Sequence, residues 1–469
     1  MAAGEITTTL ATRDPQDGLA WDEQLFDSVP VWTKQPSEAA IKRTCCKHFG
    51  LPDNEPTCTI SFFSSGAFNK LYLVTARHEK ALMRVSLPVY PTFKTRGEVT
   101  TLRWVKENTS IPVPRVLAFD DTNNNDIGFE WILMELMPGK TAYRNWRAIS
   151  MEQKKFLAET IADYQAQLAR AAARHGLDAI GTLSKNEAST NGRPEITSAE
   201  PRIVPSRLVT HEFFLGNRLK LDVPHGPFRS SQEWITTLLD MIVREQTNIA
   251  NEIADDEDSD KEEAEEIIEV AKRLLRVLPK VFPEQKSQKD SDNAISTTER
   301  TYLYHDDLNL KNILLDKDGD ISAIVDWECV SALPLWMSTR MPQFLRDDER
   351  WEEPNPDQYA PDNEDSRIPG EPSGDGEDAL DNEGKADLYW IHRGEYEATV
   401  LGKAYREKLG ELWLGWEKLR EEGFLKVYMY EAVLSCASGF FLSGISRWID
   451  AIEAGTVVRD GKVLSWVDA

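Results

Sequence analysis

The sequence predicts an α+β protein of two lobes, a small lobe built on an antiparallel sheet followed by a larger, mainly helical lobe. Two observations support this order. From Cys58 to Met137 the apolar residues recur in short runs with the period of strands, broken by turns that contain Gly or Pro. After Ser150 they recur at helical spacing over long segments. The chain has 469 residues, which is enough for two lobes with sizeable cores.

The composition indicates which partners suit the protein. The chain holds 79 acidic and 54 basic residues, a formal charge of -25, which argues against nucleic acid and anionic membrane surfaces as partners. Small neutral or cationic molecules suit this charge better. The most apolar run, Val427 to Ile445, contains Glu431 and several Ser residues, so we interpret it as a buried helix of the second lobe rather than a membrane span.

The first residues and the cysteines bear on the compartment. The start, Met1 to Glu5, shows neither the apolar core of a signal peptide nor the Arg-rich pattern of a transit peptide, so a cytoplasmic location is expected. The five Cys residues have no metal-ligand spacing and are interpreted as reduced thiols.

The small lobe is expected at 38–137, after an extension at 1–37 that is rich in Thr, Asp and Pro. Ser37 can cap a helix that runs to about Phe49, because apolar residues recur on one face of this segment. Two strands follow, and the tight loop that joins them reads Ser64, Ser65, Gly66, Ala67, Phe68 and Asn69. The backbone N–H groups of such a loop can cover nucleotide phosphates. A plain hairpin turn is the alternative, because the loop has one Gly only.

The remaining elements of this lobe lead to a linker. A strand at 81–85 precedes an amphipathic helix at 94–105, with Val99 and Leu102 facing inward. The prolines at 112 and 114 make the next segment extended. An apolar strand at 129–137 then ends at Pro138 and Gly139.

The helical lobe is expected at 138–469. Ser150 and Gln153 form a capping box that opens a long helix ending near His175. Further helices are predicted at about 234–254, 262–278 and 395–452. Two acidic insertions, at about 255–262 and 346–387, are interpreted as solvated segments, the second one disordered or a mobile flap.

The segment 304–328 carries the groups that phosphoryl transfer requires. Asp307 and Asn312 are separated by four residues, so one tight loop can aim Asp307 at a substrate hydroxyl while the Asn312 oxygen turns toward a metal. Two short strands joined by a turn at Gly319 then fold Asp326 back beside Asn312. Carboxylate and amide oxygens are ligands that Mg²⁺ prefers. A surface hairpin with Asp and Asn in its turns is the alternative for any one of these residues, and the ordered set disfavours it.

His305-Asp306-Asp307 with Asn312, followed by Asp326-Trp327-Glu328, resembles the aminoglycoside phosphotransferase and choline kinase group of small-molecule kinases, most of all its fungal branch. The resemblance covers about 58–345 and implies a bilobal protein-kinase-like fold. It also implies Mg²⁺-dependent transfer of the γ-phosphoryl group of ATP to a hydroxyl of a small molecule. In this interpretation Asp307 is the base, Asn312 and Asp326 bind the metal, and His305 supports the loop by hydrogen bonding.

The resemblance also implies the nucleotide contacts. Arg84 stands where kinases carry a phosphate-binding Lys, and it would pair with Glu98. Arg is forked and permanently charged, so it can pair with phosphate, but it is not equivalent to Lys. The alternative is a surface charge on an edge strand. The backbone of Glu135 and Met137 would bind adenine, and Met134 would lie behind the adenine pocket.

Two other functions compete with this interpretation. Arg84 and the single Gly of the phosphate loop would also suit a catalytically inert nucleotide or metabolite binder, although such a protein has no chemical reason to keep Asp307, Asn312 and Asp326 together. A protein kinase is disfavoured because Asp306 replaces the Arg that binds a phosphorylated activation loop, and because no Ala-Pro-Glu follows. The acceptor, the use of ATP or GTP and the oligomeric state are open from the sequence.

Overall fold

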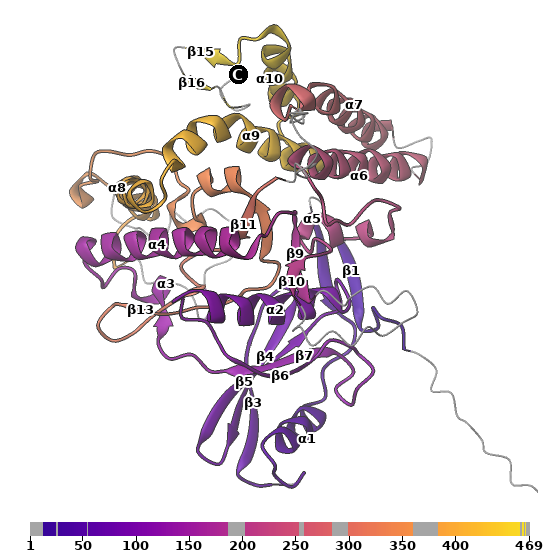
Figure 1. The fold of residues 1–469 in the computed structure, drawn as a ribbon, viewed down its shortest axis with the longest axis vertical. Helices are drawn as coiled ribbons and strands as arrows, with labels where there is room; N and C mark the ends of the chain where they lie inside the picture. The colour runs from indigo at the N-terminus through magenta and orange to yellow at the C-terminus, as the bar shows by residue number, and fades with distance from the viewer. Residues whose placement is uncertain are drawn as a thin grey trace, which may run out of the picture.

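A five-stranded antiparallel sheet forms the base of the small lobe, at the lower end of the molecule in Figure 1. The computed structural model describes residues 13–24, 27–53, 55–185, 202–252, 258–283, 299–359, 383–459, 462–463 and 465. In spatial order the strands of the sheet are β3 (Cys58–Ser65), β4 (Asn69–Ala76), β5 (Glu79–Ser86), β7 (Glu130–Glu135) and β6 (Val116–Asp120).

Helix α1 (Glu38–His48) covers part of this sheet. As predicted, Ser37 is its N-cap, and the Ser37 Oγ accepts a hydrogen bond from the backbone of Ala40. Ile41 and Cys45 of α1 are fully buried against the sheet. The helix therefore forms from a cap and an apolar face that are both local in sequence.

The chain before α1 forms a hairpin of β1 (Leu19–Gln24) and β2 (Asp27–Trp32), which the sequence did not predict. The ring of Trp32 lies 5.0 Å from that of Phe129, which anchors this hairpin to the sheet. The part of the extension before residue 13 lies outside the described residues.

Helix α2 (Phe93–Asn108) connects the two lobes. Its inward face is as predicted, with Val99 and Leu102 buried. Leu102 and Trp104, however, belong to the core of the large lobe rather than to that of the sheet. Gly97 faces β9 (Gly181–Lys185) so closely that a Cβ there would lie 2.5 Å from the Thr182 methyl group. Only glycine allows this approach of helix and strand.

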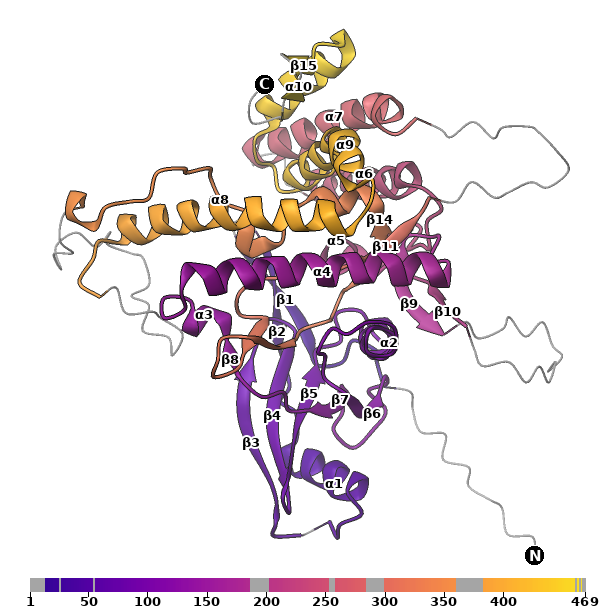
Figure 2. The ribbon, with the colours of Figure 1, turned by 60° about the vertical axis from the view of Figure 1, so that its left-hand side comes forward.

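Helices make up most of the large lobe. The long ones are α4 (Met151–His175), α6 (Ser231–Glu252), α7 (Asp258–Val281), α8 (Asp387–Leu412), α9 (Trp416–Ala437) and α10 (Leu442–Ala454). Figure 2 shows α4 and α8 side by side, and α6 packed along α7. The capping box of Ser150 and Gln153 is present, and Gly176 ends α4 in the left-handed conformation.

Short elements complete the large lobe. The short strands are β8 (Lys140–Thr141), β10 (Ile203–Pro205), β11 (Thr301–Tyr304), β12 (Ile313–Leu315), β13 (Ile321–Ile324), β14 (Ser331–Pro334), β15 (Val458–Arg459) and β16 (Lys462–Val463). The short helices are α3 (Ala142–Asn145) and α5 (His211–Phe214), with 3-10 turns at Arg218–Lys220, Leu335–Thr339, Gln343–Leu345 and Pro356–Gln358. Sheet and helices together confirm the predicted α+β class with a sheet-rich first lobe and a helical second lobe.

The apolar run at 427–445 is not one helix. It is divided between α9 and α10, because Gly439 and Phe441 both have positive φ angles, of 71° and 59°. Gly readily adopts this conformation and ends helices. Both halves are buried in the large lobe, and among the described residues we find no helix with the length and apolar character needed to cross a bilayer.

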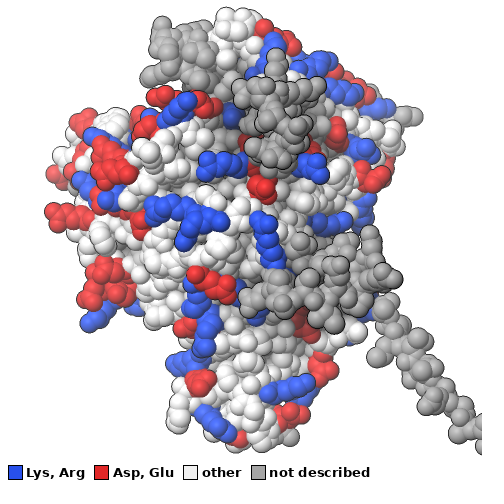
Figure 3. All heavy atoms as spheres, viewed as in Figure 1, with Lys and Arg blue, Asp and Glu red and all other residues white. Residues whose placement is uncertain are grey.

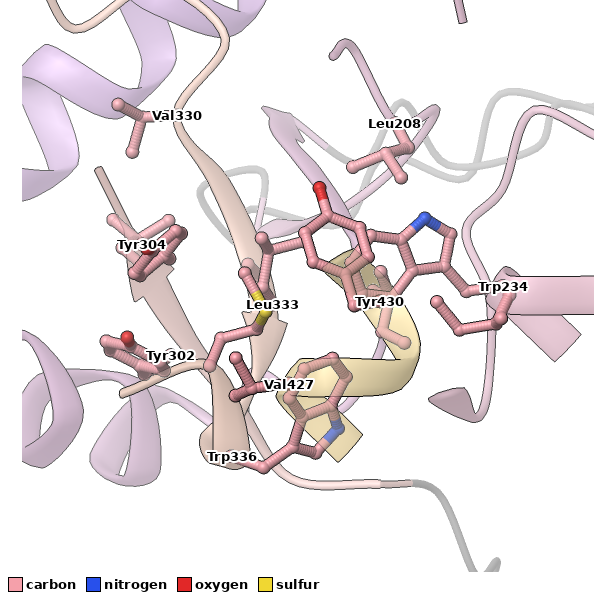
Figure 4. Packing of buried hydrophobic residues seen from close by; sticks show 14 of the residues in the cluster. Leu208, Trp234, Tyr302, Tyr304, Val330, Leu333, Trp336, Val427 and Tyr430 are labelled. Atoms are coloured by element: carbon pink, nitrogen blue, oxygen red, sulfur yellow. The ribbon is translucent and has the colours of Figure 1, made fainter. Parts of the chain in front are cut away.

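Aromatic side chains fill the core beneath β11 and β14. These strands lie next to residues 304–328, which carry the predicted catalytic residues and are called the catalytic segment below. Figure 4 shows Trp336, Trp234 and Tyr430 gathered together and Tyr302 beside Tyr304, and the two Trp rings stack at 6.2 Å. Aromatic pairs of this kind add to the stability gained from burial. Residues 304–328 thus lie next to a close-packed aromatic core.

The charge of the protein is not concentrated in one patch on the face shown in Figure 3, where acidic and basic side chains are interspersed. The predicted break between α6 and α7 corresponds to residues 253–257, which lie outside the described residues, as do 360–382 of the second acidic insertion.

Candidate active site

The loop between β11 and β12 holds Asp307 and Asn312 together. The Asn312 side-chain amide donates to the Asp307 carboxylate Oδ2 and to the Asp307 backbone carbonyl, both at 2.8 Å. Asn309 donates to the other carboxylate oxygen, Oδ1, at 2.8 Å. Because the nitrogen of the Asn312 amide is directed at Asp307, its oxygen faces the other way and is available to a cation.

The hairpin of β12 and β13 brings Asp326 to the same place. Ile313 pairs with Ile324, and the backbone N–H of Val325 donates to the Asn312 carbonyl at 2.9 Å. Asp326 follows directly, with a φ of +62°, a left-handed conformation that Asp tolerates better than most residues. The predicted hairpin is therefore present, and it unites Asp307, Asn312 and Asp326.

The linker between the lobes is fastened to this hairpin. Strand β8 pairs with β12, and the Ser322 hydroxyl donates to the Pro138 carbonyl at 2.7 Å. Gly139, with a φ of +112°, lies so close that a Cβ would be 2.5 Å from the Leu315 carbonyl oxygen. These contacts fix the distance between the catalytic segment and the linker residues Glu135 and Met137, which are both half-buried.

Met134 is buried and packs with Val99 and Ile132 between the sheet and α2. It thus lies behind the strand end that carries Glu135. That Met134 bounds an adenine pocket stays a prediction.

Arg84 is at the centre of a buried charge cluster. Its Nη2 lies 2.9 Å from Asp326 Oδ1 and 2.8 Å from Glu328 Oε2, and its Nε lies 3.4 Å from Glu98 Oε2. Arg84 is only 6% exposed, so the alternative of a surface charge on an edge strand is wrong. Arg84 and Glu98 are paired as the resemblance implied, and the cluster reaches the catalytic segment through Asp326.

Lys94 and Glu328 complete this cluster. The sequence analysis named Glu328 only as part of the Asp326-Trp327-Glu328 motif and assigned a role to neither residue. Lys94, from the first turn of α2, is 2% exposed, and its Nζ lies 2.5 Å from Glu328 Oε2. It also donates to the Asn69 side-chain oxygen at 3.0 Å, while the Asn69 amide nitrogen donates to Glu328 at 2.9 Å. Only Glu328 could have been connected with the site from the sequence, because it follows Asp326 by two residues.

The two glutamates beside Arg84 differ in protonation. Burial raises the pKa of Glu98 to about 7, although the positive charge of Arg84 opposes this change. Within the described part of the chain, the Glu98 Oε2 and the Arg84 Nε make no hydrogen bond. Burial also acts to raise the pKa of Glu328, but Lys94 and Arg84 lower it well below its usual range. Glu328 is therefore the permanent anion of the cluster.

The predicted phosphate loop is shorter than expected. Ser64 and Ser65 belong to β3, Asn69 begins β4, and only 66–68 form the turn. Ser64 to Ala67 are exposed, with Gly66 N–H donating to the Asn69 carbonyl at 2.9 Å. Phe68 instead packs on α5 of the large lobe, 5.4 Å from the rings of both His211 and Phe214. The tip of the small lobe is thus anchored to the other lobe.

His305 and Asp306 have supporting contacts. The His305 Nε2 lies 3.4 Å from the Val325 carbonyl, and its ring lies 5.1 Å from that of Trp327. Burial lowers the pKa of His305, which favours the neutral ring. Asp306 pairs with Arg340 at 2.6 Å and with Arg346 at 3.2 Å, so this carboxylate is bound by arginines of its own lobe.

The donor set fits a magnesium ion that binds together with a nucleotide. Among the residues that the structure describes, no three His, Cys, Asp or Glu side chains converge in a cage for a metal. Asn312 and Asp326 would instead offer one amide and one carboxylate oxygen. Mg²⁺ at phosphate-transfer sites is held in this way, by one or two carboxylates plus phosphate oxygens and water.

A small sheet lobe and a helical lobe that meet at the hairpin carrying Asp307, Asn312 and Asp326 define the protein-kinase-like class of fold. Residues 59–337 match the model of the phosphotransferase enzyme family, which is more than half of the chain. The chain therefore belongs to this family, and the resemblance inferred from the catalytic segment is confirmed.

Curated relatives are distant and fungal. A subtelomeric hrmA-associated cluster protein of Aspergillus fumigatus is 24% identical over 319 residues, covering 62% of this chain and 61% of that protein. A protein of Meyerozyma guilliermondii, called altered inheritance of mitochondria protein 9, mitochondrial, is 24% identical over 346 residues, covering 66% of this chain and 54% of the relative. The chain thus spans between half and two thirds of these relatives.

Solved structures with a similar fold include aminoglycoside phosphotransferases. APH(4)-Ia in its apo form has a TM-score of 0.41 at 12% identity, with 88% of this chain and 99% of that chain covered. The streptomycin–ATP complex of APH(2")-IIa also has a TM-score of 0.41 at 12% identity, with coverages of 90% and 97%.

Proposed function

We propose that the protein transfers the γ-phosphoryl group of ATP to a hydroxyl group of a small molecule. The observation that carries this proposal is the geometry of Asn312, whose amide nitrogen holds Asp307 and whose oxygen is left for a cation beside Asp326. Membership of the phosphotransferase enzyme family supports it.

Each residue of the site has a role in this reaction. Asp307 accepts the proton of the acceptor hydroxyl as the new O–P bond forms and the bond between the γ-phosphorus and the β–γ bridging oxygen breaks. The hydrogen bonds from Asn309 and Asn312 orient the Asp307 carboxylate. Asn312 and Asp326 would hold Mg²⁺, which when bound neutralises charge that develops on the phosphate oxygens.

The nucleotide would lie between the lobes. Arg84, paired with Glu98, is the cation proposed for the phosphates, and the exposed residues 64–67 would cover them. Glu135 and Met137 would bind adenine through their backbone, as in the linker of related kinases. Neutral His305 supports the loop through the Val325 carbonyl.

A catalytically inert binder is the second candidate, favoured by one observation. Arg84 Nη2 contacts Asp326 Oδ1 at 2.9 Å, so the proposed cation for phosphate is paired with the proposed metal ligand. An inert binder would bind nucleotide without Mg²⁺ and would never turn it over.

The test is ATP consumption by wild type and Asp307→Ala with Mg²⁺, over a panel of aminoglycosides, choline, ethanolamine, sugars and amino alcohols. The expected result is turnover that depends on one acceptor and falls about 100- to 10,000-fold in Asp307→Ala, the usual contribution of a general base. Nucleotide binding should persist in the variant. Acceptor-dependent turnover that survives in Asp307→Ala would contradict the proposed base.

Asp318→Asn is the matched control, because Asp318 lies in the turn of the same hairpin with its side chain 68% exposed. Its turnover should equal that of wild type. ADP binding by wild type that is indifferent to Mg²⁺, together with absence of turnover for every acceptor, would favour the inert binder.

A further inference from the structure

Lys94 is buried at the nucleotide site without a role in the mechanism proposed above. At 2% exposure its ammonium group cannot reach bulk water, and burying such a charge is costly unless it is paired. Its partners are Glu328 at 2.5 Å and Asn69 at 3.0 Å. Asn69 directly follows the turn of the phosphate loop, and Glu328 closely follows Asp326. Lys94 thus lies between the two segments that would flank the phosphates.

Arg84 is shared between two carboxylates in this site. Its Nη2 contacts Asp326 at 2.9 Å and Glu328 at 2.8 Å. A metal bound at Asp326 would draw this carboxylate away from Arg84. Glu328 would still hold Arg84. Because a buried carboxylate needs a cation, Glu328 can release Arg84 only if another positive group remains beside it.

Charge counting gives the same result. Burial brings the pKa of Glu98 to about 7, so this residue is partly neutral near pH 7. If Asp326 turned to a metal, Arg84 and Lys94 would face the full negative charge of Glu328 and part of a charge on Glu98. The excess positive charge is what the phosphates of a nucleotide can neutralise. Without Lys94, Arg84 and Glu328 would balance each other and leave none.

We propose that Lys94 is a positioning residue of the nucleotide site: it neutralises Glu328 and so leaves the fork of Arg84 to the nucleotide phosphates. This proposal rests on the proposed function, since it requires that ATP binds here. Lys94 acts through Glu328 and Arg84, which is consistent with its burial.

The experiment measures binding of ADP and of adenosine by calorimetry in the presence of Mg²⁺. In Lys94→Met, Glu328 loses its buried lysine partner and keeps Arg84, so ADP affinity should fall about 10- to 100-fold, as expected for the loss of a charged contact. Adenosine affinity should not change, because adenosine carries no phosphate. A merely structural role of Lys94 would weaken both ligands alike.

The double variant Lys94→Met/Glu328→Gln separates positioning from direct contact. Removing the carboxylate removes the group that holds Arg84, so ADP affinity should return to within a few fold of wild type. Glu328→Gln alone should bind ADP at least as tightly as wild type. Gln keeps an oxygen that can accept from Asn69, so both variants should fold even if Lys94→Met does not.

Lys154→Met is the control for loss of a buried lysine. Lys154 is 5% exposed and pairs with Glu397 at 2.8 Å on α8, in the contact of α4 with α8. It should lose stability and keep its ADP affinity.

Three results would overturn the inference. These are unchanged ADP affinity in Lys94→Met, a double variant that stays as weak as Lys94→Met, and weaker ADP binding by Glu328→Gln. If wild type binds adenosine and ADP but one of these results is found, only the role of Lys94 is wrong. If wild type binds neither ligand, the proposed function is wrong and the role of Lys94 with it.

Discussion

Arg84 donates from Nη2 to Oδ1 of Asp326 at 2.9 Å, so the cation proposed for phosphate and the carboxylate proposed for metal are hydrogen-bonded to each other. The pair joins β5 of the small lobe to the catalytic segment of the large lobe. In the proposed function a Mg²⁺ ion at Asp326 would draw on the same carboxylate as Arg84 and weaken this contact. Nucleotide phosphates would then offer Arg84 a new partner.

Asp326→Asn should raise the Mg²⁺ concentration needed for half-maximal turnover at least about tenfold, because an amide oxygen binds Mg²⁺ more weakly than a carboxylate. ADP binding without Mg²⁺ should be retained or strengthened, since Arg84 loses a competing anion. A Mg²⁺ titration of the initial rate measures the first effect. An unchanged Mg²⁺ requirement would remove Asp326 from the proposed metal site, and Asp318→Asn serves as control.

Stability should fall with rising pH through a buried glutamate of the small lobe. Glu130 is 3% exposed, accepts from Thr92 N–H at 2.5 Å, and has a pKa raised by burial to about 7 from an ordinary value of 4.5. Between pH 4.5 and about pH 7 the folded protein binds this proton more tightly than the unfolded chain does. The free energy of unfolding therefore decreases as pH rises through this range.

Glu130→Gln removes this contribution while keeping an acceptor for Thr92. From pH 5 to pH 8 the variant should gain on the order of 1 to 3 kcal/mol in the free energy of unfolding relative to wild type. Urea unfolding at the two pH values measures the difference. Parallel pH dependences of the two proteins would show that Glu130 is ionised in the fold.

Glu397 of α8 joins two long helices through a buried charge. It accepts from Lys154 on both oxygens at 2.8 Å, from Trp146 Nε1 at 2.8 Å and from Arg393 Nε at 2.7 Å. Glu397→Ala leaves Lys154 without its carboxylate and should cost about 3 to 5 kcal/mol. Glu407→Ala, at an exposed site of the same helix, should change stability by less than about 0.5 kcal/mol in the same urea assay. Equal effects of both variants would contradict the buried-pair explanation.

Thr92 precedes α2 in a strained conformation. Its φ is +68° and its ψ -49°, and the Phe93 N–H donates to the Pro91 carbonyl at 2.7 Å across it, which is a γ-turn of the rare sign. Thr92→Gly should stabilise the fold by about 1 kcal/mol, since a β-branched residue is disfavoured here. Thr92→Ala keeps an L side chain and should gain much less. A melting temperature lower for Gly than for Ala would show that the positive φ of residue 92 is not a source of strain.

The elements that could be predicted from sequence depend on local signals. The capping box at Ser150, the face of α2 that bears Val99 and the hairpin that returns Asp326 to Asn312 all follow from spacing within a few turns of chain. The convergence of Asp307, Asn312 and Asp326 could therefore be foreseen. Their chemical roles stay predictions.

What the sequence missed depends on distant partners. Lys94 resembles any cation on an amphipathic helix, and its burial is decided by Glu328, which belongs to the other lobe. Phe68 is a loop residue in sequence, and its burial depends on α5, in a segment without clear periodicity. The division at Gly439 was hidden by the uniform apolar character of the run.

The attachment of α2 to the large lobe bears on how such a protein can be controlled. Many signalling kinases are switched by swinging the corresponding helix away from the sheet, which breaks the ion pair to its glutamate. Here that helix contributes Leu102 and Trp104 to the main core and is locked against β9 at Gly97. Swinging it outward would open the interior of the large lobe. We therefore expect this helix to keep its position against the sheet whether or not ligands are bound.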